Sequence, residues 1–139
     1  MPRLTKQYKF CAAHRYWNDE WTEERNIEIF QDDVKLHGHN YQLDITVSGP
    51  IDESSGFIIN IHDLNAVVNA QVIKVLDHNQ IEKDIPWFEN KQPSTENMVV
   101  FIWEQLAEKI PKPAHLHSIK LRETPTIYTE YFGPKIIND

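Results

Sequence analysis

Three histidines are the residues of this 139-residue chain whose type and spacing most directly suggest chemistry. His37 and His39 open the alternating stretch HGHNYQLDITVS, and His14 closes the alternating stretch LTKQYKFCAAH. If the two stretches pair as antiparallel neighbours, their shared parity can turn all three imidazoles to one face. A lone histidine at a strand end is usually an ordinary polar residue, but three that converge form the ligand set of a catalytic zinc ion with one position left open. The pattern therefore predicts a zinc site.

A carboxylate and an acid–imidazole pair are further candidates. Glu123 continues the apolar alternation of HSIKLRET, where a carboxylate needs a partner or a bound molecule unless the strand frays before it. Asp77 and His78 are adjacent, just after a helix-like segment. An acid that orients an imidazole can relay protons, although a histidine at this place can equally complement the dipole of a helix C-terminus.

Three other residues carry metal-binding or nucleophilic groups. His115 and His117 share the parity of Ile119 and offer a second metal site, but no third ligand is placed beside them, and we expect a solvated pair at a sheet edge. Cys11 falls on the strand face opposite His14, so we expect it to be packed and to serve neither as a ligand nor as a nucleophile.

Strands and helices must position these groups. Alternation predicts strands over 4–14, 37–48, 117–124 and 127–132, with a short apolar strand over 57–60. Helical spacing of apolar residues predicts helices over 61–76 and, capped by Ser94 or Thr95, up to Ile110. Two connections remain, a charged and aromatic one over 15–36 with a helical turn at 22–30, and a loop over 77–93. The order β-β-α-α-β-β indicates an α+β domain, residues 1–139, with helices on one face of an antiparallel sheet.

Composition excludes several classes of protein. A formal charge of −7 argues against a nucleic-acid binder, while a small anionic substrate in a local basic pocket stays possible. There is no apolar run of the roughly 18 residues that a membrane span needs, and the start MPRLTKQYKF has no apolar signal region. A single cysteine cannot form an internal disulfide, which favours a reducing cytoplasm.

Five motifs together resemble one known family. FCAAH, HGHNY, LDHNQI, STEN and LRET occur in the order, and over nearly the whole length, of the 6-pyruvoyltetrahydropterin synthase and 6-carboxytetrahydropterin synthase family. The resemblance implies the tunnelling fold (T-fold), in which trimers close their sheets into a barrel and two trimers stack into a homohexamer. It also implies Zn²⁺ on His14, His37 and His39, with sites that lie between subunits.

The family's substrate is a small molecule, 7,8-dihydroneopterin triphosphate. The resemblance implies that Glu123 holds the pterin ring with help from Thr95 and Glu96, since a carboxylate can accept hydrogen bonds from the ring's amino and NH groups. Zinc would polarise the side-chain hydroxyls of the substrate. Asp77 and His78 would return a proton.

One position departs from the family. Bacterial members carry a catalytic cysteine four residues before HGH, and this chain has Asp33 there, preceded by Asp32. An aspartate (pKa about 3.9) is a weaker base than a thiol (about 8.5). A related subgroup with glutamate at this place makes 6-hydroxymethyl-dihydropterin by retro-aldol cleavage. Asp33 is therefore the candidate base, and the alternative is a solvated acidic turn in an enzyme that is weakened or repurposed.

The function expected is a zinc-dependent lyase. Elimination of triphosphate, formation of a 6-carboxy product and retro-aldol cleavage are three open outcomes. Two alternatives come from other classes. A non-catalytic pterin- or purine-binding module would bind without turnover. A zinc hydrolase using metal-bound hydroxide would not depend on Glu123.

Overall fold

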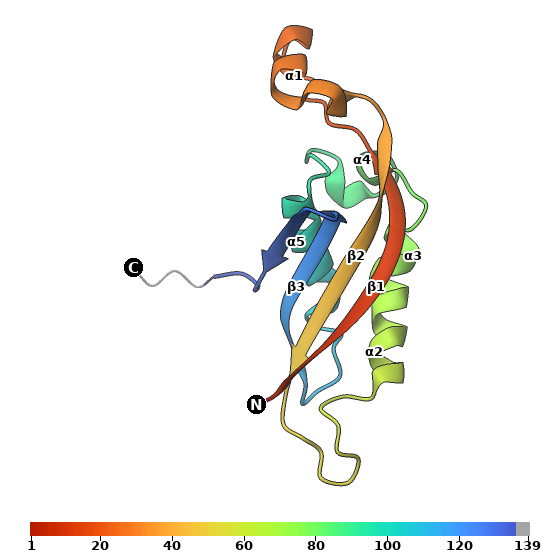
Figure 1. Ribbon diagram of the computed structural model, residues 1–139, viewed down its shortest axis with the longest axis vertical. Coiled ribbons are helices and arrows are strands. Elements are labelled where there is room, and N and C mark those ends of the chain that lie inside the picture. The colour runs from red at the N-terminus through yellow and green to blue at the C-terminus, as the bar shows by residue number, and fades with distance from the viewer. Residues whose placement is uncertain (136–139) are drawn as a thin grey trace.

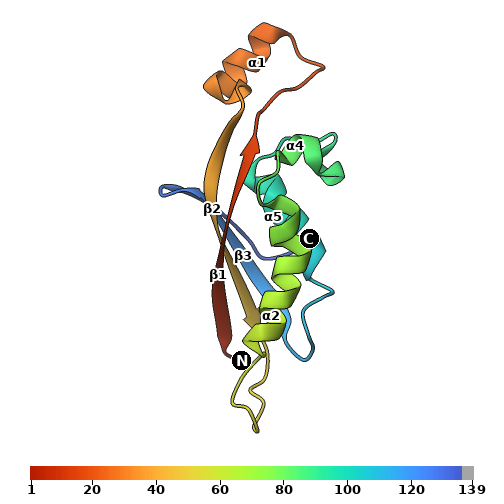
Figure 2. The ribbon, with the colours of Figure 1, turned by 90° about the vertical axis from the view of Figure 1, so that its right-hand side faces the viewer.

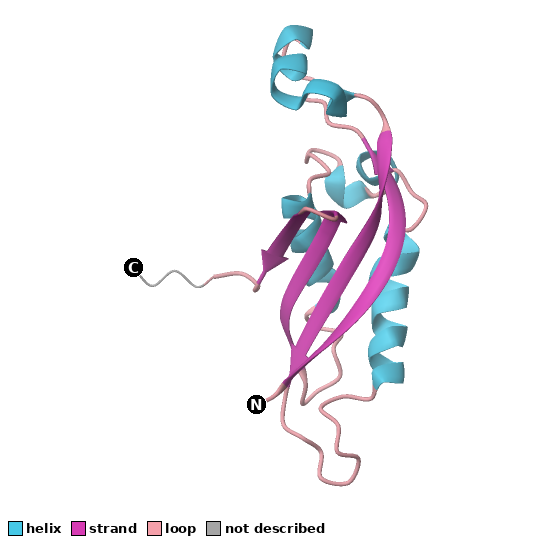
Figure 3. Cartoon of the chain, in the orientation of Figure 1, coloured by secondary structure: helices cyan, strands magenta, loops and turns pink. Residues whose placement is uncertain are grey.

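The computed structural model describes residues 1–135, which build one antiparallel sheet with helices against it (Figures 1 and 3). The sheet order is β1-β2-β3-β4, with bounds Arg3–His14 (β1), His37–Ser48 (β2), His115–Thr124 (β3) and Ile127–Tyr131 (β4). Figure 2 shows α2 (Ile61–Val68) and α5 (Thr95–Leu106) on one face of the sheet. The predicted α+β architecture is confirmed. Within residues 1–135, no helix combines the length and apolar character needed to cross a membrane.

The pairing of β1 with β2 brings the histidines together. The register sets His14 opposite His37 and Ala12 opposite His39. Apolar residues on the same parity are buried under the helices, which is why this register holds. They are Tyr8, Phe10 and Ala12 from β1, and Tyr41, Leu43, Ile45 and Val47 from β2. The alternation predicted for both strands is confirmed.

A bulge in β3 overturns the parity expected for His115 and His117. Thr46 pairs with Ser118, but Val47 pairs with Leu116, so the register shifts between them. Leu116 is therefore buried in place of its neighbours, because one extra residue on a bulged strand reverses the faces beyond it. His115 is exposed, and His117 is half-buried against the ring of Phe132 (ring centroids 5.8 Å).

The first predicted helix is confirmed over 61–76 as α2 and α3 (Lys74–Leu76), joined by a π-helical turn (Asn69–Ile73). The strand expected over 57–60 is wrong. Asn60 instead caps α2, because its side-chain oxygen accepts a hydrogen bond from the backbone N–H of His62 (2.9 Å).

The segment over 77–93 is more ordered than the loop we predicted. It contains α4 (Ile81–Asp84) and a 3-10 turn (Pro86–Phe88). Three of its large apolar side chains are buried and hold these turns to the core: Ile81, Ile85 and Phe88. Ser94 Oγ caps α5 by accepting from Asn97 N (3.2 Å), and α5 ends at Leu106, although Ile110 beyond it is still buried.

The connection between β1 and β2 forms an arm that carries α1 (Glu23–Phe30) beyond the end of both strands (Figure 1). Asn26 is its only fully buried polar side chain among the described residues. Its Oδ1 accepts from Asn18 N (2.7 Å), and its Nδ2 donates to Asn18 O and Thr22 O (both 3.0 Å). One amide thus closes the base of the arm.

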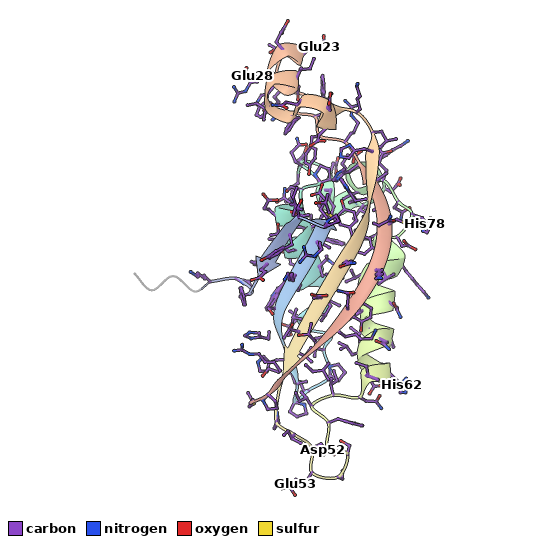
Figure 4. All side chains as sticks on the ribbon, viewed as in Figure 1. Glu23, Glu28, Asp52, Glu53, His62 and His78 are labelled. Atoms are coloured by element: carbon purple, nitrogen blue, oxygen red, sulfur yellow. The ribbon has the colours of Figure 1, made fainter. Side chains whose placement is uncertain are left out.

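We expect Asn26→Ala to loosen the arm by about 2 kcal/mol, because it removes three side-chain hydrogen bonds and leaves the half-buried backbone N–H and C=O of Asn18 without the Asn26 amide. Amide hydrogen exchange over 18–34 should then run about 30-fold faster, while exchange in β2 changes little. Glu28→Ala, an exposed position on the same helix (labelled in Figure 4), is the control. Unchanged exchange in Asn26→Ala would show that the arm is held by other contacts.

Candidate active site

The three predicted histidines converge. The Nε2 atoms of His14 and His37 lie 3.0 Å apart, and one ring nitrogen from each histidine falls within 4.8 Å of the others. His14 Nδ1 contacts the Pro93 carbonyl (3.0 Å), and His37 Nδ1 contacts the Lys35 carbonyl (2.7 Å). Because a carbonyl only accepts, both Nδ1 atoms carry the proton and both Nε2 atoms present lone pairs.

This donor set fits zinc. Two lone pairs at 3.0 Å repel each other unless a positive charge lies near both, so the contact between His14 and His37 is not an ordinary hydrogen bond. His39 Nε2 is buried and has no hydrogen-bond partner. It lies 2.8 Å from Glu123 Oε1, but the angles of this contact are not those of a hydrogen bond. Nε2 atoms that converge without hydrogen-bonding to one another, with the Nδ1–H groups of His14 and His37 held by carbonyls, are typical of histidine ligands.

The surroundings of His14 favour its neutral imidazole. Burial first, and then the nearby His37, lower the pKa of His14, and the hydrogen bond to the Pro93 carbonyl opposes them; the net pKa is about 4. The imidazole is therefore neutral at physiological pH, which is the state that binds a metal.

Glu123 lies against the histidine cluster, where its parity suggested. Its Oε1 is 2.8 Å from His39 Nε2 and 3.9 Å from His14 Nε2, and its side chain is 16% exposed. Thr95 is buried at the start of α5, and its Oγ1 hydrogen-bonds with Glu96 Oε1 (3.0 Å) and Thr129 Oγ1 (2.7 Å). The Glu123 carboxylate thus flanks the cluster as a hydrogen-bond acceptor, which a polar ring with several N–H groups would need.

Asp33 lies at the rim of the cluster, in a 3-10 turn (Gln31–Val34). Its Oδ1 is 3.7 Å from His37 Nε2, and the side chain is 60% exposed. Its backbone carbonyl accepts a hydrogen bond from Tyr16 N (2.9 Å), which ties the turn to the end of β1. Asp32 is exposed, and no side-chain contact joins it to the cluster within the described residues. Of the two aspartates, Asp33 is the one positioned to act there.

Two tyrosines that the sequence analysis did not single out for chemistry complete the site. The Tyr41 hydroxyl lies 3.4 Å from His14 Nδ1, beneath the histidines. The Tyr16 ring packs on the His14 ring (centroids 5.0 Å) and stacks on Phe30 of the arm (5.4 Å). The sequence could have indicated Tyr41, because it continues the alternation of His37 and His39. It gave no indication of Tyr16, which lies in a connection without a clear hydrophobic period.

The carboxylates of the site gather around Tyr16. Burial raises the pKa of Tyr16 above its usual range, and the negative charges of Glu123, Asp33 and Glu96 raise it further. Burial and Glu123 likewise raise the pKa of Tyr41. Both phenols therefore stay protonated and can donate hydrogen bonds inside an acidic pocket.

Asp77 and His78 are not part of this cluster. Asp77 Oδ2 contacts His78 Nδ1 (2.9 Å), as predicted for a pair, but His78 is exposed at the outer edge of β1 (Figure 4). The hydrogen bond from Cys11 N to Asp77 Oδ1 (2.9 Å) lowers the pKa of Asp77, and burial partly opposes this. Cys11 is on the predicted face, but it is only half-buried beside His78, so the expectation that it is simply packed is wrong.

Comparison with known proteins identifies the family. Residues 3–134 match the family model described as 6-pyruvoyl tetrahydropterin synthase. The chain belongs to this family. The family resemblance carried by the five motifs is confirmed over residues 3–134.

Members of the 6-pyruvoyl tetrahydropterin synthase family with different names are similar to this chain. The 6-pyruvoyl tetrahydrobiopterin synthase of Drosophila melanogaster is 36% identical over 97% of this chain and 82% of its own. The dihydroneopterin monophosphate aldolase of Pyrococcus furiosus is 30% identical over 87% of this chain and 89% of its own. The solved 6-pyruvoyl tetrahydropterin synthase of Caenorhabditis elegans has a TM-score of 0.86 at 28% identity, over 96% of this chain and 98% of that one.

Proposed function

We propose that this protein is a zinc-dependent lyase that acts on the hydroxylated side chain of a dihydropterin, 7,8-dihydroneopterin triphosphate or a close relative. One observation carries the proposal. Three histidine Nε2 atoms converge, and the Glu123 carboxylate lies 2.8 Å from one of them. A metal site and an acceptor for the ring of a pterin therefore adjoin each other.

The roles of the residues follow from their chemistry. Zinc on His14, His37 and His39 supplies Lewis-acid polarisation of the substrate's side-chain hydroxyls. Glu123 accepts hydrogen bonds from the ring amino and NH groups, and the Thr95–Glu96 pair at the start of α5 adds polar contacts. Tyr16, stacked between His14 and the arm, covers the site and excludes water from one side.

Asp33 is the proposed base. A solvated carboxylate is a weak base, suited to a hydroxyl proton that becomes acidic beside a metal better than to a carbon-bound proton. Removal of a hydroxyl proton leads to retro-aldol cleavage, and the similarity to a dihydroneopterin monophosphate aldolase supports this branch. The higher identity to a 6-pyruvoyl tetrahydrobiopterin synthase supports the elimination branch, so the product decides between them.

We expect Asp33→Ala to lower turnover about 100-fold, because a positioned general base contributes roughly that much. The zinc-loaded protein is incubated without oxygen with 7,8-dihydroneopterin triphosphate or monophosphate, and the pterins are identified by mass and retention. Asp32→Ala, one residue away and exposed, is the matched control and should keep its activity. If Asp33→Ala turns over as fast as wild type, Asp33 takes no part in the reaction. If Asp33→Cys gains turnover, this chain has left the thiol chemistry of its family.

A homohexamer is part of the proposal. In one chain, Asp77 and His78 lie on the side of β1 away from His14, so a relay from this pair has to serve the histidine cluster of an adjacent copy. The edges of the sheet are β1 and β4. Residues 78 and 79 already hydrogen-bond to β1 at Cys11 and Ala13, which leaves β4 and the first part of β1 for pairing between copies. Exposed apolar residues on β4 support this: Ile127, Tyr128 and, just beyond it, Phe132.

A further inference from the structure

Gln92 holds the arm to the body of the protein through one side-chain amide. Gln92 Oε1 accepts a hydrogen bond from Trp17 N (3.2 Å), and Gln92 Nε2 donates one to Trp17 O (2.8 Å). The amide therefore pairs with both backbone groups of one residue, as a neighbouring strand would, and these two partners fix its orientation. Trp17 lies shortly after the end of β1, where the chain leaves the sheet and enters the arm (Figure 1).

Gln92 is held in turn by the segment that starts α5. Its backbone carbonyl accepts a hydrogen bond from Asn97 Nδ2 (2.8 Å), in the first turn of that helix. The carbonyl of the next residue, Pro93, contacts His14 Nδ1 (3.0 Å), and Pro93 is buried. Two consecutive residues therefore contact the arm, through the Gln92 side chain, and a candidate metal ligand, through the Pro93 carbonyl.

The base of the arm carries this restraint on to Asp33. Tyr16, the residue before Trp17, donates its backbone N–H to the Asp33 carbonyl (2.9 Å). Arg15 Nε donates to the Val34 carbonyl (3.0 Å), so the 3-10 turn that contains Asp33 is held at two points. The Asp33 side chain is 60% exposed, and the backbone of this turn therefore sets where its carboxylate lies beside the histidine cluster.

We propose that Gln92 is a positioning residue, whose pair of hydrogen bonds with Trp17 sets the place of the Asp33 carboxylate beside the histidine cluster. This role rests on the function proposed above and adds a residue to it. Gln92 acts through the backbone of the arm and handles no proton itself. Misplacement of a catalytic group by about 1 Å can cost roughly 100-fold in rate, so a contact outside the site can control turnover.

The first test needs no turnover. Gln92→Met keeps the length of the side chain and removes both hydrogen bonds, and Gln92→Ala removes the whole side chain beyond Cβ. We expect amide exchange at Tyr16 and Trp17 to run about tenfold faster in both variants, because the Trp17 N–H has lost its acceptor, while exchange in β2 changes little. Asn90→Ala, which removes an exposed amide from the same loop, is the matched control. Gln92 and Trp17 line a cavity of about 690 Å³ and not the core, so the variants should fold.

The second test is a double-mutant cycle on turnover, with Gln92→Met, Asp33→Ala and the double variant. We expect Gln92→Met alone to lower kcat about 30-fold, with KM within about threefold and zinc content unchanged, because the base is misplaced and the candidate metal ligands are not. In the Asp33→Ala background, Gln92→Met should lower kcat by less than about twofold, since no base is left to position. A residue that only stabilises the fold would show no such dependence on Asp33.

Three results would overturn the proposal. One is exchange at Trp17 in Gln92→Met equal to that of wild type. Another is full kcat in Gln92→Met, or a fall in kcat that is the same with and without Asp33. The third is a loss of zinc together with kcat, which would mean that the segment acts through the contact of Pro93 with His14. If wild type itself turns over no dihydropterin, the proposed function fails, and Gln92 keeps only the role in holding the arm that the exchange rates measure.

Discussion

Substitution of His37 by alanine is expected to lower turnover at least about 1,000-fold, or about 4 kcal/mol in the barrier, and to release zinc. Three nitrogen ligands hold a catalytic zinc ion, and even the loss of an outer hydrogen-bond partner costs such sites 10–100-fold in affinity. His37 is the best of the three histidines for this test because its side chain is 27% exposed, whereas His14 is fully buried and packed on Tyr41. Removing His37 therefore opens no cavity in the core.

The measurement pairs metal content with kinetics. Zinc per chain is determined after dialysis against a weak chelator, and kcat/KM is measured on the dihydropterin substrate that gives a product with wild type. His62→Ala removes an exposed histidine from α2 (Figure 4) and should change neither quantity. A His37→Ala protein that keeps both its zinc and its turnover would mean that the cluster is not the metal site.

The second large effect is expected at Glu123. Glu123→Gln should lower kcat/KM about 100-fold, about 3 kcal/mol, because an amide presents one acceptor oxygen and an NH₂ group where the carboxylate presents two oxygens. Zinc content should stay the same, since the three imidazoles are untouched. Glu130→Gln, on the neighbouring strand β4 and ion-paired with Lys120 (4.0 Å), is the matched control. Unchanged lyase activity in Glu123→Gln would remove this residue from ring recognition.

Glu123 also separates the alternative functions. A zinc hydrolase would cleave activated esters or phosphates equally well in wild type and in Glu123→Ala. A non-catalytic binding module would bind the dihydropterin in wild type, lose it in Glu123→Ala, and form no product in either. The proposed lyase loses both binding and product.

Much of the sheet could be predicted because it depends on local alternation. In β1 and β2, every second residue from Tyr8 to His14 and from Tyr41 to Val47 faces the core, and the strands pair without a shift. Prediction failed where tertiary packing overrides the local pattern. The bulge beside His117 depends on how β3 meets β2, and the turns over 81–88 depend on a core that buries Phe88.

The candidate site also has one part that the sequence could predict and another that it could not. The convergence of His14, His37 and His39 follows from one strand pairing, so the sequence was sufficient to place it. The contacts of Tyr16 with His14 and of Cys11 with His78 join segments that have no common period, and only the folded chain brings them together. The zinc ion and the role of Asp33 stay predictions until metal and product are measured.

The arm that carries α1 has a consequence for how such an enzyme can change its reaction. The candidate metal ligands are held by β1 and β2, whereas Asp33 belongs to an arm that Asn26 closes through its own hydrogen bonds. Substitutions in the arm can therefore exchange the group that handles protons without disturbing the core that orients the imidazoles. The strand pair that holds the histidines can therefore stay the same during evolution while the catalytic group changes. The short segment before HGH can carry a thiol, a carboxylate or neither.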